Sequence, residues 1–187
     1  ARLLQGRKGV AILERTDQPL AEDLPIMCEI RAALTKCLEN GQVGKGEALP
    51  YPAYPTYQAG EMPRLYSGCY GLGSRDLQPE GVIAAVENML PEGARRKFFY
   101  LSIDFLREPV DPKDEIRIQQ LKDAYPRLGE LALRGSENPN LLPKGAVTVR
   151  MHSVGGWGAV TTGKNLAMTL YDLLGFDIRA NPKYGSE

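Results

Sequence analysis

Residues 64–103 read RLYSGCYGLGSRDLQPEGVIAAVENMLPEGARRKFFYLSI, and this stretch decides the fold class. Arg64 to Cys69 is a short run bounded by a glycine turn, which is typical of a buried strand. Pro79 to Leu90 has apolar residues at three- and four-residue spacing, which predicts a helix buried through Val82, Ile83, Val86 and Leu90. Lys97 to Ile103 is a further strand-like run. Strand, helix and strand in succession favour a parallel α/β sheet with right-handed crossovers.

The alternation of strand and helix extends toward the N-terminus. Gly9 to Glu14 is a buried-type strand, and Asp23 through Leu38 predicts a helix that stops at Asn40-Gly41. Gln42 to Pro63 holds prolines, glycines and tyrosines without any period, which indicates an excursion outside the core. Cys37 falls on the same helical face as the apolar residues of the predicted helix, so we expect a reduced packing residue.

Toward the C-terminus the chain divides into two predicted domains. Asp114 to Tyr125 predicts a charged amphipathic helix that ends near Pro126, and the polar residues 135–144 predict a linker. We expect residues 1–134 to form one α/β domain and residues 145–187 to be the incomplete N-terminal part of a second, Rossmann-like α/β domain. So small a second part seldom buries enough surface to stand alone, so we expect the chain to be an internal segment of a longer polypeptide.

The start of the second predicted domain is rich in glycine. Residues 145–165 read GAVTVRMHSVGGWGAVTTGKN, which predicts a strand ending near Val154 and a helix from Ala159, with a further strand expected at Phe176 to Ala180. Glycines at 155, 156 and 158 allow a sharp turn between them. The first N–H groups of a helix lack internal partners and the helix dipole favours negative charge there. The junction therefore predicts a phosphate or carboxylate site.

Two phosphate-binding motifs come close to this run without matching it. Gly158 to Asn165 nearly spells the nucleoside-triphosphate loop, but Asn165 replaces the hydroxyl that ligates magnesium. Gly156 to Thr161 is close to a dinucleotide fingerprint, which also needs an acidic residue at the end of the next strand, where Asn181 stands. NAD and ATP are both disfavoured, and a P-loop-like phosphate-binding protein is the weakest alternative.

Polar residues also end the first two predicted strands. Glu14, Arg15 and Asp17 lie where open α/β sheets place ligands, although an arginine between two acids equally forms an ion pair that holds the turn. The turn Tyr70 to Ser74 has two glycines, and it too could either bind a ligand or serve only the structure of the chain.

Composition argues against several function classes. Lys plus Arg equals Asp plus Glu at 23 each, so there is no basic excess to hold nucleic acid. No apolar run approaches the roughly 20 residues of a membrane span. Three scattered cysteines cannot supply an iron–sulfur cluster, and the single histidine, His152, gives no Ser-His-Asp arrangement. We predict no metal site and no catalytic residue in this chain.

The segments Ser153 to Lys164, Ala11 to Pro19 and Ser67 to Pro79 resemble three segments of one family, the 2-oxoacid:acceptor oxidoreductases, which include the pyruvate and 2-oxoglutarate ferredoxin enzymes. The first resembles the glycine loop of the family's gamma-type domain, with Trp157 at its variable position. The other two resemble the Asp-Arg-Thr-Lys-Glu-Pro and Gly-Gly-Arg-Tyr-Gly-Leu-Ser-Ser-Lys-Glu-Phe-Thr-Pro segments of the transketolase-C-terminal-like domain, which precedes the gamma-type domain in the fused enzymes.

This resemblance implies a cytoplasmic, multi-subunit enzyme that decarboxylates a 2-oxoacid such as pyruvate oxidatively to an acyl-coenzyme A and passes electrons to ferredoxin or flavodoxin. Thiamine diphosphate, magnesium and [4Fe-4S] clusters would lie on other domains or subunits, and those would be the partners of this segment. The segment itself would contribute to assembly and bind coenzyme A through six residues: Ser153, Gly155, Gly156, Gly158, Thr161 and Lys164.

The alternative is a purely structural module. The first domain would dock the thiamine-binding subunits, and the glycine turn would serve only tight packing between strand and helix. Substitutions in the turn would then disturb assembly and leave coenzyme A affinity unchanged.

Overall fold

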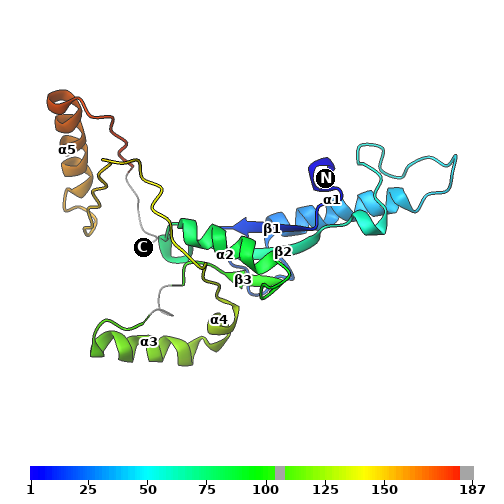
Figure 1. Ribbon diagram of the computed structural model, residues 1–187, viewed down its shortest axis with the longest axis horizontal. Coiled ribbons are helices and arrows are strands. Elements are labelled where there is room, and N and C mark those ends of the chain that lie inside the picture. The colour runs from blue at the N-terminus through cyan, green and yellow to red at the C-terminus, as the bar shows by residue number, and fades with distance from the viewer. Residues whose placement is uncertain (104–107, 182–187) are drawn as a thin grey trace. The chain divides into compact units, whose positions relative to one another are not determined.

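The computed structural model describes residues 1–103 and 108–181. In these residues the chain has an α/β fold with a three-stranded, all-parallel sheet and five α-helices (Figure 1). Its contacts divide it into two units, Ala1–Pro139 and Asn140–Glu187, each of which is described by itself below. The parallel α/β class was predicted by the alternating strands and helices. The assignment of the units to transketolase-C-terminal-like and gamma-type domains stays a prediction, and residues 182–187 of the latter lie outside the described residues.

The sheet of the first unit has the order β1-β2-β3, with β1 at Gly9–Glu14, β2 at Arg64–Cys69 and β3 at Phe98–Tyr100. Gly9 pairs with Arg64 at one end and Glu14 with Cys69 at the other. The first two strands have the predicted bounds. The third is shorter than expected, because Ser102 takes a left-handed conformation (φ +63°) that turns the chain out of the sheet.

Two helices cover opposite faces of this sheet. On one face, α1 (Pro25–Gly41) packs through Met27, Leu34 and Cys37 against Ile12 and its neighbours. On the other face, α2 (Pro79–Met89) packs through Ala84 and Ala85 against aromatic side chains of β2 and β3. The first unit therefore has three layers, and Cys37 is a buried packing residue, as predicted.

The two crossovers differ in hand. Successive strands advance in the same direction across the sheet, yet the first crossover carries its helix over one face and the second over the other. When two crossovers step in the same direction across a parallel sheet but place their helices on opposite faces, one crossover is right-handed and the other left-handed. The expectation of right-handed crossovers throughout is therefore wrong for one of the two.

The buried face of α2 is not the predicted one. Val82, Val86 and Leu90 are 47%, 49% and 40% exposed. The buried residues of the helix are instead small or polar: Gly81, Ala84, Ala85 and Asn88. Large rings from Tyr66 and Phe99 fill this side of the sheet, so the helix approaches through its alanines.

Residues 42–57 form an arm that folds back along α1. The buried side chain of Asn40 donates to the carbonyl oxygens of Tyr51 (2.8 Å) and Tyr54 (3.0 Å) and accepts from the N–H of Tyr51 (3.0 Å). At the far end of the arm, the hydroxyl of buried Tyr57 donates to the carbonyl of Ala1 (2.6 Å). Asn40 therefore anchors the arm, whereas the sequence suggested only a helix stop.

The remainder of the first unit returns to the sheet. The predicted charged helix is α3 (Pro112–Ala124), capped by the Asp111 carboxylate, which accepts from the N–H of Asp114 (2.8 Å). Proline at the start of a new helix explains why a short α4 (Pro126–Leu131) follows directly. The N–H of Leu133 then donates to the carbonyl of Tyr100 (2.9 Å), which brings the chain alongside β3.

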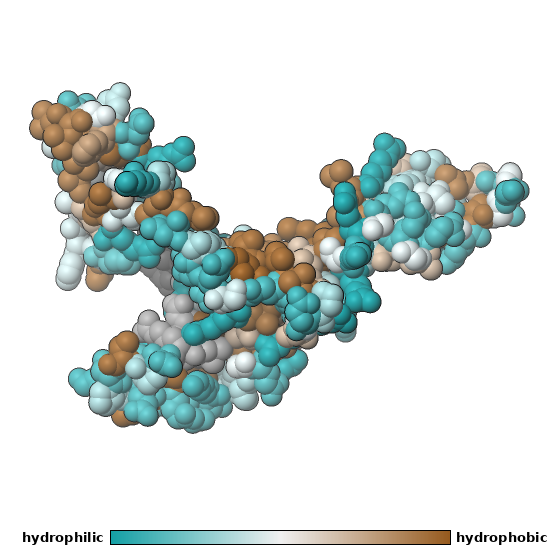
Figure 2. All heavy atoms as spheres, viewed as in Figure 1, coloured by the Kyte–Doolittle hydropathy of each residue, from teal (hydrophilic) through white to brown (hydrophobic). Residues whose placement is uncertain are grey.

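The second unit contains one helix, α5 (Ala159–Leu174), which ends at a left-handed Gly175. Its described residues form no strand, so the strands predicted before Val154 and over Phe176 to Ala180 are wrong. A strand needs a neighbouring backbone to pair with, and this unit offers none in its described part. No residue of α5 is buried, and Figure 2 shows apolar side chains on its surface.

None of the helices in the described part of the chain is long and apolar enough to cross a membrane.

Candidate functional site

The glycine turn, defined here as Gly155–Gly158, leads directly into α5. Gly156 and Gly158 have φ values of +83° and +78°, in the left-handed region that glycine enters without steric cost. Between them lies Trp157, whose N–H donates to the carbonyl of Val154 at 3.3 Å. Two left-handed glycines let the chain reverse within four residues. The expected sharp turn is therefore present, although no strand precedes it.

Space around the glycine turn is open. An ideal Cβ atom placed on Gly155, Gly156 or Gly158 would meet no heavy atom within 4 Å beyond its chain neighbours. The indole of Trp157 is 78% exposed. Close packing against the described residues therefore does not explain the glycines, and among these residues the backbone of the turn stays open to a ligand.

The start of α5 carries backbone donors that have no partner among the described residues. Its first hydrogen bond runs from the N–H of Thr162 to the carbonyl of Gly158 (2.9 Å). The N–H groups of residues 159–161 precede that bond, and no side chain caps the helix. These three donors and the positive end of the helix dipole make a local environment that favours an anion.

The six predicted binding residues lie on both sides of this turn. Gly155, Gly156 and Gly158 form it, and Thr161 is in the first turn of α5. Lys164 lies three residues further along, so it neighbours Thr161 on the helix surface. The side chains of Ser153, Thr161 and Lys164 are exposed, and within the described residues the side chains of Ser153 and Lys164 form no hydrogen bond or ion pair. Their role in binding stays a prediction.

The carboxyl ends of the strands carry the second set of predicted polar residues, and their contacts there are internal. The carboxylate of Glu14, which is buried, accepts from the N–H groups of Ile26 (2.7 Å) and Met27 (3.1 Å). It thereby serves the first turn of α1 from a strand end, as a helix-capping residue would. Sequence reasoning missed this role. The available signal was that Leu24 and Pro25 at the start of α1 offer no capping side chain.

Neighbouring side chains at this edge also form hydrogen bonds within the chain. The phenol of Tyr100 donates to Asp17 Oδ2 (2.9 Å), and burial together with that hydrogen bond raises the pKa of Tyr100 to about 12. The thiol of Cys69 donates to the carbonyl of Thr16 (3.0 Å), and burial raises the pKa of Cys69 to about 12. Both groups stay protonated near neutral pH. The Arg15 stem lies against Gly71, where a Cβ atom would come within 2.8 Å of Arg15 Cγ.

The described residues contain no cluster of metal ligands and no polar partner for the single histidine. No group of three His, Cys, Asp or Glu side chains there could hold a metal ion, and the three cysteines are free thiols, with Cys28 exposed. His152 is exposed and has no hydrogen bond or ion pair within residues 1–103 and 108–181.

The chain matches no protein-family model and no curated protein.

Proposed function

We propose that the chain is a non-catalytic segment of a 2-oxoacid:ferredoxin or flavodoxin oxidoreductase, which assists assembly and holds a phosphate of coenzyme A at the glycine turn. The observation that supports this proposal is the open turn, where two left-handed glycines precede unpaired N–H groups at the start of α5. The resemblance of three sequence segments to that family is the reason for proposing this enzyme and this ligand.

The chemistry of the turn fits a phosphate. Backbone N–H groups and the helix dipole attract negative charge, and the small volume of glycine lets an oxygen approach the main chain. Ser153 and Thr161 add hydroxyl donors, and Lys164 adds a positive charge. Coenzyme A, when bound, would accept the acyl group. Thiamine diphosphate, magnesium and iron–sulfur clusters would be held elsewhere in the enzyme.

The first test is calorimetric titration of coenzyme A and 3′-dephospho-coenzyme A into the 187-residue chain and into Gly156→Asp. We expect the substitution to weaken binding at least about tenfold, which corresponds to about 1.4 kcal/mol, since it adds negative charge and strains a left-handed residue. Gly145→Asp is the matched control, because Gly145 also has a left-handed φ (+86°) and open space around it. Equal losses in both variants, or none in Gly156→Asp, would remove the turn from the site.

A second test addresses the charge. Lys164→Gln should lower coenzyme A affinity about three- to tenfold at low salt and less at 0.5 M NaCl, because an exposed ion pair is screened. Lys144→Gln is the control, since Lys144 is equally exposed and lies before the turn. Identical behaviour of the two variants contradicts a role for Lys164.

A docking role for the second unit, distinct from docking of thiamine-binding subunits by the first domain, has an observation of its own in its favour. The exposed side chains of α5 include Met168, Tyr171, Leu173 and Leu174, and no described residue of the helix is buried. Such an apolar surface is typical of a protein interface. Under this reading, Leu174→Gln changes the sedimentation of the assembled enzyme while coenzyme A affinity stays at the wild-type value.

A further inference from the structure

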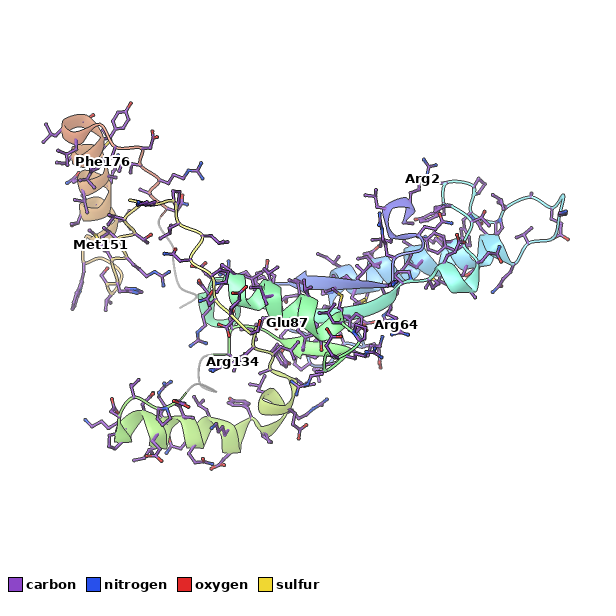
Figure 3. The ribbon with its side chains drawn as sticks, in the orientation of Figure 1. Arg2, Arg64, Glu87, Arg134, Met151 and Phe176 are labelled. Carbon is purple, nitrogen blue, oxygen red and sulfur yellow. The ribbon has the colours of Figure 1, made fainter. Side chains whose placement is uncertain are left out.

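The amino ends of the three parallel strands gather basic side chains at one edge of the sheet. Arg7 and Lys8 directly precede β1, Arg64 begins β2, and Arg95, Arg96 and Lys97 directly precede β3. Because the strands are parallel and Gly9 pairs with Arg64, these six residues share one edge, called the cationic edge below. Figure 3 labels Arg64 at this end of the sheet.

Few acidic residues accompany these cations along the chain. Glu61 and Glu92 lie just before two of the basic segments, and the Glu61 carboxylate accepts from the side chain of Gln5 and the N–H of Gln58. The segments 1–13, 62–74 and 93–103 contain neither Asp nor Glu. Within residues 1–103 and 108–181, none of the six forms an ion pair. The chain as a whole has a net charge of zero, so this edge is a local excess that repels itself unless a counter-charge arrives.

The turn that carries Arg95 and Arg96 is held by hydrogen bonds and contains a strained residue. Buried Asn88 donates to the carbonyl of Arg96 (3.0 Å) and accepts from the N–H of Arg96 (2.9 Å). The main-chain carbonyl of Asn88 accepts from the N–H of Arg95 (3.0 Å), and Arg95 is held at φ +52°. A left-handed non-glycine residue costs about 1–3 kcal/mol and persists only where its surroundings hold it. The fold thus fixes Arg95 at the edge.

An apolar stripe adjoins the cationic edge. α2 ends at this edge. Its exposed residues Val82 and Val86 are spaced four apart on one side of the helix, and the exposed Leu90 follows as the residue that caps the helix end. The cationic edge and the apolar stripe are in contact, because Arg95 Nε donates to the carbonyl of Leu90 (3.3 Å). A surface that joins arginines to aliphatic residues resembles the composition of protein interfaces.

We infer that the cationic edge and the adjoining stripe of α2 bind an acidic polypeptide surface in which Asp and Glu flank an apolar centre. Charge complementarity selects the partner's sign, and the aliphatic stripe selects a protein over a nucleic acid. Three strands span only about 10 Å, and Tyr66, the ring beneath Lys97, is buried, so the edge offers no exposed aromatic side chain for a base to stack on. The inference is independent of coenzyme A binding at the glycine turn.

The test uses the 187-residue chain and three labelled probes in fluorescence anisotropy at 50 and 200 mM NaCl. The probes are a 14-residue peptide of alternating Glu-Glu and Leu-Leu pairs, its Gln-for-Glu counterpart, and the oligonucleotide dT20. We expect the acidic peptide to bind best, with affinity at least about tenfold above the Gln peptide at 50 mM NaCl and lower at 200 mM. Stronger binding of dT20 would overturn the choice of a protein partner.

Two matched charge reversals locate the surface. Lys8→Glu, Arg64→Glu and Arg95→Glu together should weaken the acidic peptide at least about tenfold. Lys45→Glu, Lys113→Glu and Lys122→Glu together change the net charge equally at exposed residues of the arm and α3, and should change affinity less than about threefold. Equal losses in both triple variants overturn the proposal.

Two further substitutions keep the test decisive if the triple variant does not fold. Lys8→Glu alone removes one exposed charge and should still weaken the peptide, whereas Lys45→Glu should not. Val86→Gln should weaken it about threefold through the stripe. Wild-type affinity in both Lys8→Glu and Val86→Gln would contradict the inference.

Discussion

Single buried polar residues position much of this molecule. Glu14, Asn40 and Asn88 are each almost inaccessible to solvent, and each bonds to main-chain groups of a different segment. Buried polar side chains are stable only when they are paired, so each of the three fixes its segment to the core. Glu14 serves the start of α1, Asn40 the arm, and Asn88 the turn that carries Arg95.

Asn88→Ala should lower the free energy of unfolding by about 1–3 kcal/mol, because it leaves the N–H and the carbonyl of Arg96 without partners. Urea denaturation measures this change. Asn138→Ala is the control, since the exposed Asn138 makes one long bond to the N–H of Glu80 (3.3 Å) and should cost less than about 0.5 kcal/mol. A loss in Asn138→Ala as large as that in Asn88→Ala would contradict the role given to Asn88.

Alkaline pH should destabilise the first unit through Tyr100 and Cys69. Their folded pKa values of about 12 exceed the ordinary values of 10 and 9, so the folded state holds these protons more tightly than the unfolded state. The resulting stability is complete below about pH 9 and is lost as pH rises toward about 12. Tyr100→Phe should flatten the fall in the free energy of unfolding between pH 9 and 11. The exposed Tyr171→Phe should follow the wild-type curve, and a wild-type slope in Tyr100→Phe would refute the assignment.

At the scale of elements, α2 shows what periodicity can and cannot decide. The spacing of apolar residues predicted a helix over nearly the observed range, from Pro79 to Met89. The same spacing allows two buried faces, one of valines and one of alanines, and sequence alone favoured the larger side chains. The alanine face is the buried one because Phe99 and Tyr66 of the neighbouring strands fill the space and leave room only for small residues.

A pair of substitutions to leucine tests this packing. Ala85→Leu adds volume against filled aromatic packing and should cost about 1–3 kcal/mol of unfolding free energy. Val86→Leu adds one methylene on the exposed side and should stay within about 0.5 kcal/mol of wild type. Urea denaturation of both variants decides between the two faces; the reverse order of costs would restore the valine face.

For the molecule as a whole, the parallel α/β class and the features set by nearby residues were predicted, whereas contacts between particular distant residues were not. The bounds of β1 and β2, the positions of α1 and α3, and the glycine turn all depend on nearby residues, and each was predicted. The strands expected near Val149 and Ile178 did not form, because a strand depends on a pairing partner that the sequence pattern does not reveal. The capping role of Glu14 was missed for the same reason, since its helix begins eleven residues later.

The two helices α1 and α5 should differ sharply in amide hydrogen exchange. α1 buries Met27, Leu34 and Cys37, whereas α5 has 16 residues and buries none, and a helix without packing is marginal in water. We expect the protection of α5 amides to be at least about 100-fold lower than that of α1 amides, measured by mass spectrometry at neutral pH. Comparable protection would mean that α5 is covered by a second copy of the chain.

The arm has a practical consequence for handling this protein. Asn40 holds the returning limb of the arm at Tyr51 and Tyr54, and Tyr57 holds its end. Gly44 to Glu47 lies before these anchors and has a backbone bond from the N–H of Glu47 to the carbonyl of Gly44. Sequence inserted between Lys45 and Gly46 would therefore extend an exposed turn whose return to the core is fixed by other residues. An epitope or fluorophore grafted there can report on the protein while both termini remain untouched.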